Sequence, residues 1–161
     1  MLELNADPTI QDVHGETPLH LADRYSIDEI KNLLLLDERI TKRNLVSKFG
    51  RSHFQIACSS ALPKVVEKFL KQGADPNELN YFEDNEVRQM LPPISICFAF
   101  TPLHIARNPH VIKVLLKYGA NPKIEDYKGW TSLHDVAYCC DADLIKTLVR
   151  YVKFCLKMNF S

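Results

Sequence analysis

The sequence predicts an all-α solenoid of about four stacked helix pairs, connected by β-turn fingers, in which the first and last units are incomplete. One observation is a motif that recurs along the chain, as TPLHLA at 17–22, RSHFQIA at 51–57, TPLHIA at 101–106 and TSLHDVA at 131–137. A second is a loop marker, written NADPT at 5–9, GADPN at 73–77 and GANPK at 119–123. Self-similar units of this size bury their apolar faces only against their neighbours, so they stack in single file.

Each unit is predicted to hold a short helix followed by a longer amphipathic one. The expected N-caps of the short helices share a hydroxyl that can accept a free backbone amide, and they are Thr17, Ser52, Thr101 and Thr131. Pro18 and Pro102 follow at the first helical position, where no amide is needed. Gly73 and Gly119 stand where a left-handed residue ends the second helix. Apolar residues at helical spacing predict the buried face of the second helices: Ile30, Leu33 and Leu34; Val65, Val66, Phe69 and Leu70; Val111, Ile112, Leu115 and Leu116; Leu144, Ile145, Leu148 and Val149.

These motifs resemble the ankyrin repeat, and the resemblance covers nearly the whole chain. It implies an ankyrin-repeat solenoid that forms a single domain over residues 1–161. Its expected parts are the end of a truncated repeat with its finger (1–14), repeat 1 (15–49), repeat 2 (50–77), an inserted long loop (78–98), repeat 3 (99–123), and repeat 4 with a C-terminal extension (124–161).

The units depart from the family pattern in several places. Repeat 1 ends without the loop marker, so its outer loop is expected to be rebuilt. Repeat 3 is short, and Pro109 is expected to open its second helix directly after a shortened first helix. The insertion at 78–98, with Ala99 in place of a finger glycine, is expected to be an extended turn or a mobile loop. Both ends are apolar, which indicates either a piece of a longer array or ends that meet a partner; the C-terminal residues concerned are Val152, Phe154, Leu156, Met158 and Phe160.

Composition narrows the class of protein. The 161 residues are 46% hydrophobic, with 20 basic and 20 acidic side chains that cancel, so we expect no nucleic-acid partner and no membrane partner. The N-terminus lacks a secretory pattern, and the aliphatic run at 33–36 is too short to span a bilayer. Five cysteines are an odd number for disulfide pairing and favour the cytoplasm or nucleus.

No constellation of residues predicts catalysis. His20, His104 and His134 recur once per unit, which separates them along the stack instead of gathering them around a metal ion; the resemblance implies that they hydrogen-bond between adjacent loops. The spacing of Cys139 and Cys140 matches no usual zinc site. Phosphate-binding loops and nucleophile elbows are missing from the sequence, and four aspartates are expected to cap loop turns: Asp7, Asp12, Asp75 and Asp126. We expect no enzyme, no cofactor and no metal.

The resemblance implies that a protein partner binds the concave face, formed by the fingers and the outer side of each first helix. The positions expected to be exposed there are Val13, His14, Glu16, Arg24, Tyr25, Lys48, Phe49, Arg51, Ser59, Ser60, Cys97, Phe98, Phe100, Asn108, Tyr127, Lys128, Trp130, Tyr138 and Cys139. Aromatic and arginine side chains dominate interface energetics. The predicted partner-binding residues are therefore Arg24, Tyr25, Phe49, Arg51, Tyr127, Lys128, Trp130 and Tyr138, although some of these rings could instead pack over neighbouring fingers.

The predicted function is a non-catalytic adaptor, scaffold or inhibitor that binds a protein of unknown identity. The alternative is a regulatory or targeting ankyrin domain of a larger enzyme, channel or ubiquitin-ligase adaptor. The chain is expected to be monomeric unless its apolar ends associate. The resemblance also makes Asn77 a candidate for hydroxylation, although Phe69 stands where a leucine would be preferred.

Overall fold

The computed structural model describes residues 6–48, 50–82, 98–139 and 141–158. In chain order its elements are α1 (Pro18–Arg24), α2 (Asp28–Leu35), α3 (Glu38–Arg43), α4 (His53–Ser59), α5 (Pro63–Lys71), β1 (Asn80–Phe82), β2 (Phe98–Phe100), α7 (Pro102–Ile105), α8 (Pro109–Lys117), α9 (Ser132–Tyr138) and α10 (Ala142–Met158).

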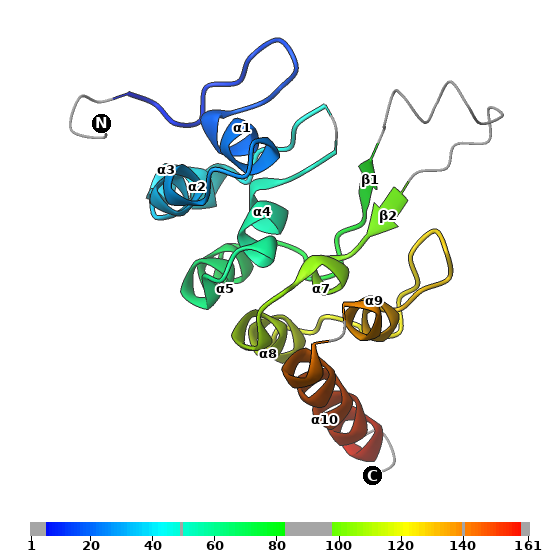
Figure 1. Cartoon of the computed structure of the whole chain (residues 1–161). Helices are drawn as coiled ribbons and strands as arrows, with labels where there is room; N and C mark the ends of the chain where they lie inside the picture. The colour runs from blue at the N-terminus through cyan, green and yellow to red at the C-terminus, as the bar shows by residue number, and fades with distance from the viewer. Residues whose placement is uncertain (1–5, 49, 83–97, 140, 159–161) are drawn as a thin grey trace, which may run out of the picture.

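The helices form layers that follow one another in single file (Figure 1). The first helices α1, α4, α7 and α9 pack successively along one side of the stack, and the second helices α5, α8 and α10 do so along the other. Each layer is one repeat, so repeat 1, with α1 and α2, lies at one end of the stack, and repeat 4, with α9 and α10, lies at the other. This arrangement confirms the predicted all-α solenoid. Among the described helices, none combines the length and apolarity needed to cross a bilayer.

The predicted helix boundaries depend on local hydrogen bonds. Thr17, Thr101 and Thr131 each form a capping box with the histidine three residues later. Ser52 Oγ accepts the amide of Gln55 at 3.2 Å, so repeat 2 keeps its cap without a histidine. Gly73 and Gly119 adopt φ of 96° and 92° after the second helices, a region open to glycine without a steric penalty; the other glycines that share a positive φ are Gly15, Gly50 and Gly129.

The outer loop of repeat 1 is rebuilt as an additional helix. The helix α2 ends at Leu35, and Asp37 then caps α3 by accepting the amide of Arg39 at 2.8 Å. Asn44 ends α3 in a left-handed conformation, and its Oδ1 accepts the amide of Phe54 at 2.8 Å. Because α3 contacts both α4 and α5, it takes the place beside repeat 2 that the second helix holds in the other layers.

Repeat 3 is shortened as predicted. The first helix, α7, contains 4 residues, and α8 begins at Pro109 with Asn108 Oδ1 accepting the amide of His110 at 2.8 Å. The expected extended turn or mobile loop at 78–98 has ordered ends: β1 and β2 form an antiparallel pair in which Asn80 lies opposite Phe100. Residues 83–97 lie outside the described part of the chain.

The core runs through all layers, and its largest fully buried side chains come from every repeat: Phe54, Phe69, Leu19, Leu35, Ile40, Ile56, Leu103, Ile112, Leu115, Leu144 and Leu148. The prediction was wrong for the first unit, because Ile30 is 47% exposed and Leu33 is 61% exposed. The equivalents of Ile30 in the later repeats are buried beside a preceding layer, which the described structure does not place before α1, whereas the equivalent of Leu33 in repeat 2 is the exposed Lys68. The predicted apolar C-terminal side chains, Val152, Phe154, Leu156, Met158 and Phe160, lie outside the described part of the structure.

Candidate functional site

Aspartate side chains hold the finger turns. Asp126 Oδ1 accepts the amides of both Lys128 and Trp130 at 2.8 Å, and Asp12 Oδ1 accepts the amides of His14 and Glu16 at the same distance. The bond from the Glu16 amide lowers the pKa of the Asp12 carboxyl. Similar turns confirm the structural role of the other two predicted aspartates, Asp7 and Asp75.

The repeat histidines tie each layer to the next finger. The Nδ1 atom of His20 accepts the amide of Thr17, so its Nε2 carries the proton and donates to Arg51 O at 2.9 Å. His104 is bonded in the same way, and its Nε2 reaches Trp130 O at 3.1 Å. Burial lowers the pKa of His20, which favours this neutral form. The predicted stacking role is confirmed for these two histidines.

The described residues contain no group of three histidine, cysteine or acidic side chains placed to hold a metal ion. Cys139 is exposed at the end of α9, and Cys140 lies outside the described residues. Cys58 is fully buried, and burial raises the pKa of its thiol well above its usual value. A buried neutral thiol of this kind acts as a small core side chain.

The loops that follow the second helices are also linked. Asn77 Nδ2 donates to Gly119 O at 3.1 Å, and its Oδ1 accepts the amide of Asn121 at 2.7 Å. Repeats 2 and 3 are therefore joined on this side by one side chain. Hydroxylation of Asn77 stays a prediction.

Aromatic side chains gather on the fingers and first helices of repeats 3 and 4. Phe100 and Tyr127 meet edge to face with ring centroids 5.8 Å apart, and Trp130 and Tyr138 lie 5.7 Å apart. We call this group, which consists of Phe100, Tyr127, Trp130 and Tyr138, the aromatic ledge. Tyr138 is 77% exposed and Tyr127 is 36% exposed, whereas Trp130 is half-buried and stacks on His134.

The ammonium of Lys128 lies over the aromatic ledge. Lys128 Nζ is 5.2 Å from the ring centroid of Tyr127 and 5.3 Å from that of Trp130, within the range of a cation–π contact. Tyr127 raises the pKa of Lys128, so the ammonium stays charged. Nearby on α9, Asp135 is half-buried, and burial raises the pKa of its carboxyl.

The basic residues of repeats 1 and 2 are held by acids. Arg24 pairs with the Glu16 carboxylate, and Arg51 Nε lies 3.0 Å from Asp23 Oδ2. Asp23 also lies 3.7 Å from the ammonium of Lys31. The Arg51 pair therefore joins repeats 1 and 2, the Arg24 pair lies within repeat 1, and a partner would have to compete with both acids.

The structure brings together only part of the predicted site. Tyr127, Lys128, Trp130 and Tyr138 form one group around α9, whereas Arg24 ends α1 and Arg51 lies in the finger before α4, where each pairs with an acid. Phe49 and Cys97 lie outside the described residues, as does the side chain of Phe98. Two positions expected to be exposed are buried, Glu16 at 5% and Ser60 at 6%. Glu16 is covered through its ion pair with Arg24, and Ser60 donates its hydroxyl to Ile56 O inside repeat 2.

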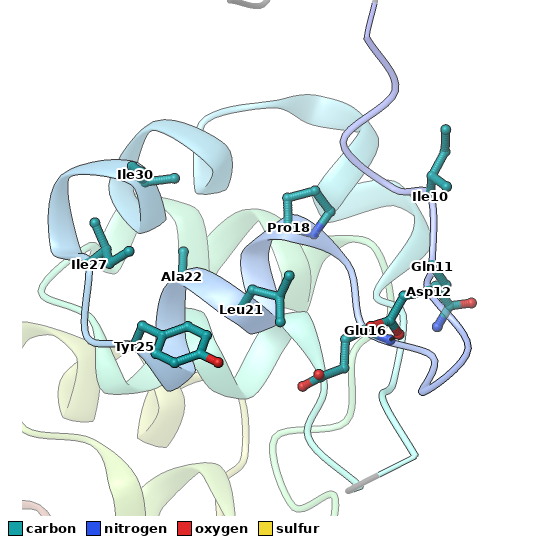
Figure 2. A pocket seen from close by; sticks show the side chains of 10 residues that line it. All are labelled: Ile10, Gln11, Asp12, Glu16, Pro18, Leu21, Ala22, Tyr25, Ile27 and Ile30. Atoms are coloured by element: carbon teal, nitrogen blue, oxygen red, sulfur yellow. Dashed lines mark hydrogen bonds between the residues drawn. The ribbon is translucent and has the colours of Figure 1, made fainter.

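Tyr25 belongs to a different surface. It is 68% exposed and lines a groove of about 450 Å³ at the α1 end of the stack (Figure 2). We call this groove the N-terminal groove; its lining is mostly apolar and comprises Ile10, Gln11, Asp12, Glu16, Pro18, Leu21, Ala22, Tyr25, Ile27 and Ile30. The sequence gives a signal for it, because Leu21 occupies the position of Ile56 and Ile105 in a unit that has no described layer before it.

Comparison with known proteins gives the same assignment. Residues 100–127 match the family described as Ankyrin repeat. An ankyrin repeat protein of Acanthamoeba polyphaga mimivirus is 26% identical over 142 residues, which cover 86% of this chain and 16% of that protein. The human transient receptor potential cation channel subfamily A member 1 is 32% identical over 128 residues, or 77% of this chain and 10% of the channel. An IkB-like protein of African swine fever virus is 37% identical over 86 residues, or 51% of this chain and 35% of that protein.

The chain thus spans between 10% and 35% of the length of these relatives. The family match falls on repeat 3, in which the finger, the capping box of Thr101 and the shortened α7 have been described. Repeats 1 and 4 carry the same threonine–histidine capping box, repeat 1 carries the same bond from a histidine to the next finger, and repeat 2 has the same closing glycine. With its helix pairs stacked in this way, the chain belongs to the ankyrin-repeat family.

Proposed function

We propose that the chain binds a protein partner through the aromatic ledge on its finger side, and acts as an adaptor, scaffold or inhibitor. Ankyrin repeats are protein-interaction modules and are generally non-catalytic. One observation carries the choice of surface: Tyr138 is 77% exposed beside Trp130, and Lys128 lies over the rings of Tyr127 and Trp130.

The ledge is fixed before any partner arrives. The backbone of Trp130 is held by Asp126, which accepts its amide, and by His104, which donates to its carbonyl. The ring of Trp130 is in addition stacked on His134. A contact surface that is already ordered loses less conformational entropy on binding, so more of its apolar burial remains as affinity.

The chemistry of the ledge resembles that of an interface centre. Tyrosine and tryptophan are enriched among the residues that dominate binding, because they bury a large rigid area and still offer a polar group. Lys128 adds a charged group at the same place, over Tyr127 and Trp130. A partner segment with an apolar side chain beside a carboxylate would match both features.

Affinity capture with matched baits tests this proposal. The chain, its double variant Trp130→Ala with Tyr138→Ala, and the control Leu36→Ala would be immobilised and exposed to a cell extract. Leu36 is 62% exposed on the outer side and lies away from the fingers. We expect proteins that bind the wild type and Leu36→Ala to be lost from the double variant, with at least a tenfold drop in affinity for a purified partner. Equal binding by a double variant with native helicity would contradict the proposal.

A second candidate is an interaction domain within a larger protein, such as a channel, an enzyme or a ubiquitin-ligase adaptor. The match that favours it is the cation channel, of which this chain covers 10% at 32% identity. The IkB-like relative, covered over 35% of its length, favours an inhibitor instead. The longest transcript that contains this sequence distinguishes them, because a catalytic or channel-forming region in the same reading frame supports the second candidate.

We also propose that the chain works in the cytoplasm or nucleus. Cys58 is buried as a thiol in the core of repeat 2, and Cys139 is an exposed thiol. Such thiols persist where the surroundings are reducing. Imaging of the tagged full-length protein tests this placement.

A further inference from the structure

Side chains at equivalent repeat positions are more exposed at the α1 end of the stack than in the later repeats. Ile30, Val65, Val111 and Leu144 occupy the same position of the second helix, yet Ile30 is 47% exposed and the other three are 4%, 0% and 1% exposed. Leu21 of the first helix is 36% exposed, and its equivalent Ile56 is 0% exposed. The N-terminal groove is therefore the surface that every later repeat covers with its predecessor (Figure 2).

The opposite end shows the complementary pattern. His20 and His104 are 4% and 2% exposed because the next finger lies over them, whereas His134 at the same position is exposed. Ala137 is exposed at the position of Asp23, whose carboxylate pairs with Arg51 of the next layer. We call this surface, which includes His134 and Ala137 of α9 and its N-cap Thr131, the C-terminal face.

A specific hydrogen bond is available between the two ends. In the interior, a histidine Nε2 of one layer donates to the finger carbonyl of the next, as His20 does to Arg51 and His104 to Trp130. His134 Nδ1 is bonded within its capping box, and the described residues supply no finger carbonyl for its Nε2. Glu16 is the finger residue that precedes α1, so its carbonyl corresponds to those of Arg51 and Trp130.

Charge also matches between the ends. The helix α2 beside the N-terminal groove begins with Asp28 and Glu29 and has one lysine. The helix α10 of the last layer carries one acid against four basic residues, which are Lys146, Arg150, Lys153 and Lys157. An acidic helix start and a basic helix attract each other across a shared interface, and the attraction weakens with salt.

From these observations we propose that a second copy of this chain occupies the N-terminal groove by stacking its C-terminal face there, head to tail, as though the solenoid continued from one molecule into the next. Each contact repeats the interior geometry, with apolar burial of Leu21 and Ile30 and a bond from His134 to the carbonyl of Glu16. Such a contact uses two different surfaces, so it leaves one of each unoccupied and builds open chains of molecules. The proposal does not require the partner of the aromatic ledge, although His134 of the C-terminal face also stacks on Trp130 of the ledge.

Sedimentation velocity on the full chain tests it through two single-face variants. Ile30→Lys places a charge in the N-terminal groove, and Ala137→Glu places one on the C-terminal face; both positions are exposed in helices, so the fold should survive. We expect the average mass of the wild type to rise above 18.5 kDa with concentration, and each variant alone to remain a monomer. Val46→Lys, at a position 52% exposed in the second finger and outside the groove lining, is the control and should associate like the wild type.

A mixture of the two variants decides the geometry. Ile30→Lys keeps an intact C-terminal face and Ala137→Glu an intact groove, so the mixture should form a 1:1 dimer of twice 18.5 kDa and no longer chain. A wild type that is monomeric at every concentration, an Ala137→Glu variant that dimerises alone, or a mixture that stays monomeric would each overturn the proposal. If Ile30→Lys loses its circular dichroism signal, Leu21→Glu replaces it in the same design.

Discussion

The first helices of repeats 1 and 2 have the same length and nearly the same role, yet they differ in burial. In α4 the six residues from His53 to Cys58 are all buried, whereas in α1 only Leu19, His20 and Ala22 are. The buried set of α1 faces its own layer and repeat 2, and its exposed Leu21 faces away from the stack. In a solenoid the neighbours on both sides decide which apolar residues are core, because each unit contacts only the units next to it.

The largest expected effect on stability comes from truncating the same repeat position in repeat 4 and in repeat 1. Leu144→Ala should lower the free energy of unfolding by about 2–5 kcal/mol, because it leaves a cavity at a site that is 1% exposed. Ile30→Ala, at the equivalent and half-exposed site, should cost less than about 1 kcal/mol. Urea unfolding followed by circular dichroism at low protein concentration measures both. Equal losses would show that the α1 end is packed as tightly as the interior.

Acid should weaken the junction of repeats 1 and 2. His53 is fully buried there, with its Nε2 2.8 Å from Thr17 Oγ1 and its ring 4.7 Å from that of His20. Burial, and then repulsion by His20, lower its pKa from 6.5 to about 3. Between about pH 3 and pH 6.5 the unfolded chain therefore binds a proton at His53 and the folded chain does not. The contribution of His53 to the free energy of unfolding is full above about pH 6.5 and is lost as the pH falls toward about 3.

At about pH 5 the loss due to His53 should be about 2 kcal/mol relative to about pH 7. His20, with its lowered pKa, adds to it, whereas Glu78 and Asp135, whose pKa values burial raises, act in the opposite direction. The difference between wild type and His53→Gln isolates the His53 contribution in urea unfolding at both pH values. An unchanged slope in the variant would mean that another group causes the acid sensitivity.

A smaller effect should separate an interior histidine from a terminal one. His104→Ala and His134→Ala each remove a capping box and one ring contact, with Phe100 for His104 and with Trp130 for His134, but only His104→Ala also removes an inter-layer hydrogen bond, the one to Trp130 O. The first substitution should cost about 1 kcal/mol more than the second, which is the net value of one hydrogen bond. Thermal and urea unfolding of the two variants measure this difference, and equal costs would imply that the inter-layer bond contributes nothing.

Most of the fold could be predicted because its determinants are local. The caps at Thr17 and Ser52, the closing Gly73 and Gly119, and the short repeat that begins α8 at Pro109 all act within a few residues of the sequence position that shows them. The exposure of Ile30 could not be read from its own segment. Its periodicity is that of a core residue, and it is exposed because no layer precedes α1 among the described residues.

Part of the candidate site could likewise be predicted from local sequence, and part of it depends on contacts that the sequence pattern does not show. Tyr127, Trp130 and Tyr138 come together because they sit on one finger and the helix after it. The repeat position of Tyr25 predicts the same face, but its side chain lines the N-terminal groove. The burial of Glu16 depends on Arg24, eight residues away, and periodicity carries no information about that ion pair.

The smallest expected effect on stability concerns the cation of the aromatic ledge. Lys128 is exposed, so Lys128→Met should leave the urea midpoint within experimental scatter. It should nevertheless shift the fluorescence of Trp130, the single tryptophan of the chain, because the ammonium lies 5.3 Å from that ring. Lys123→Met, at an exposed position in the loop before the finger, is the matched control and should leave the emission unchanged. A Lys128→Met spectrum identical to the wild type would mean that the cation does not lie over the aromatic ledge in solution, and the proposed surface would then be the four aromatic side chains of the ledge without a fixed charge.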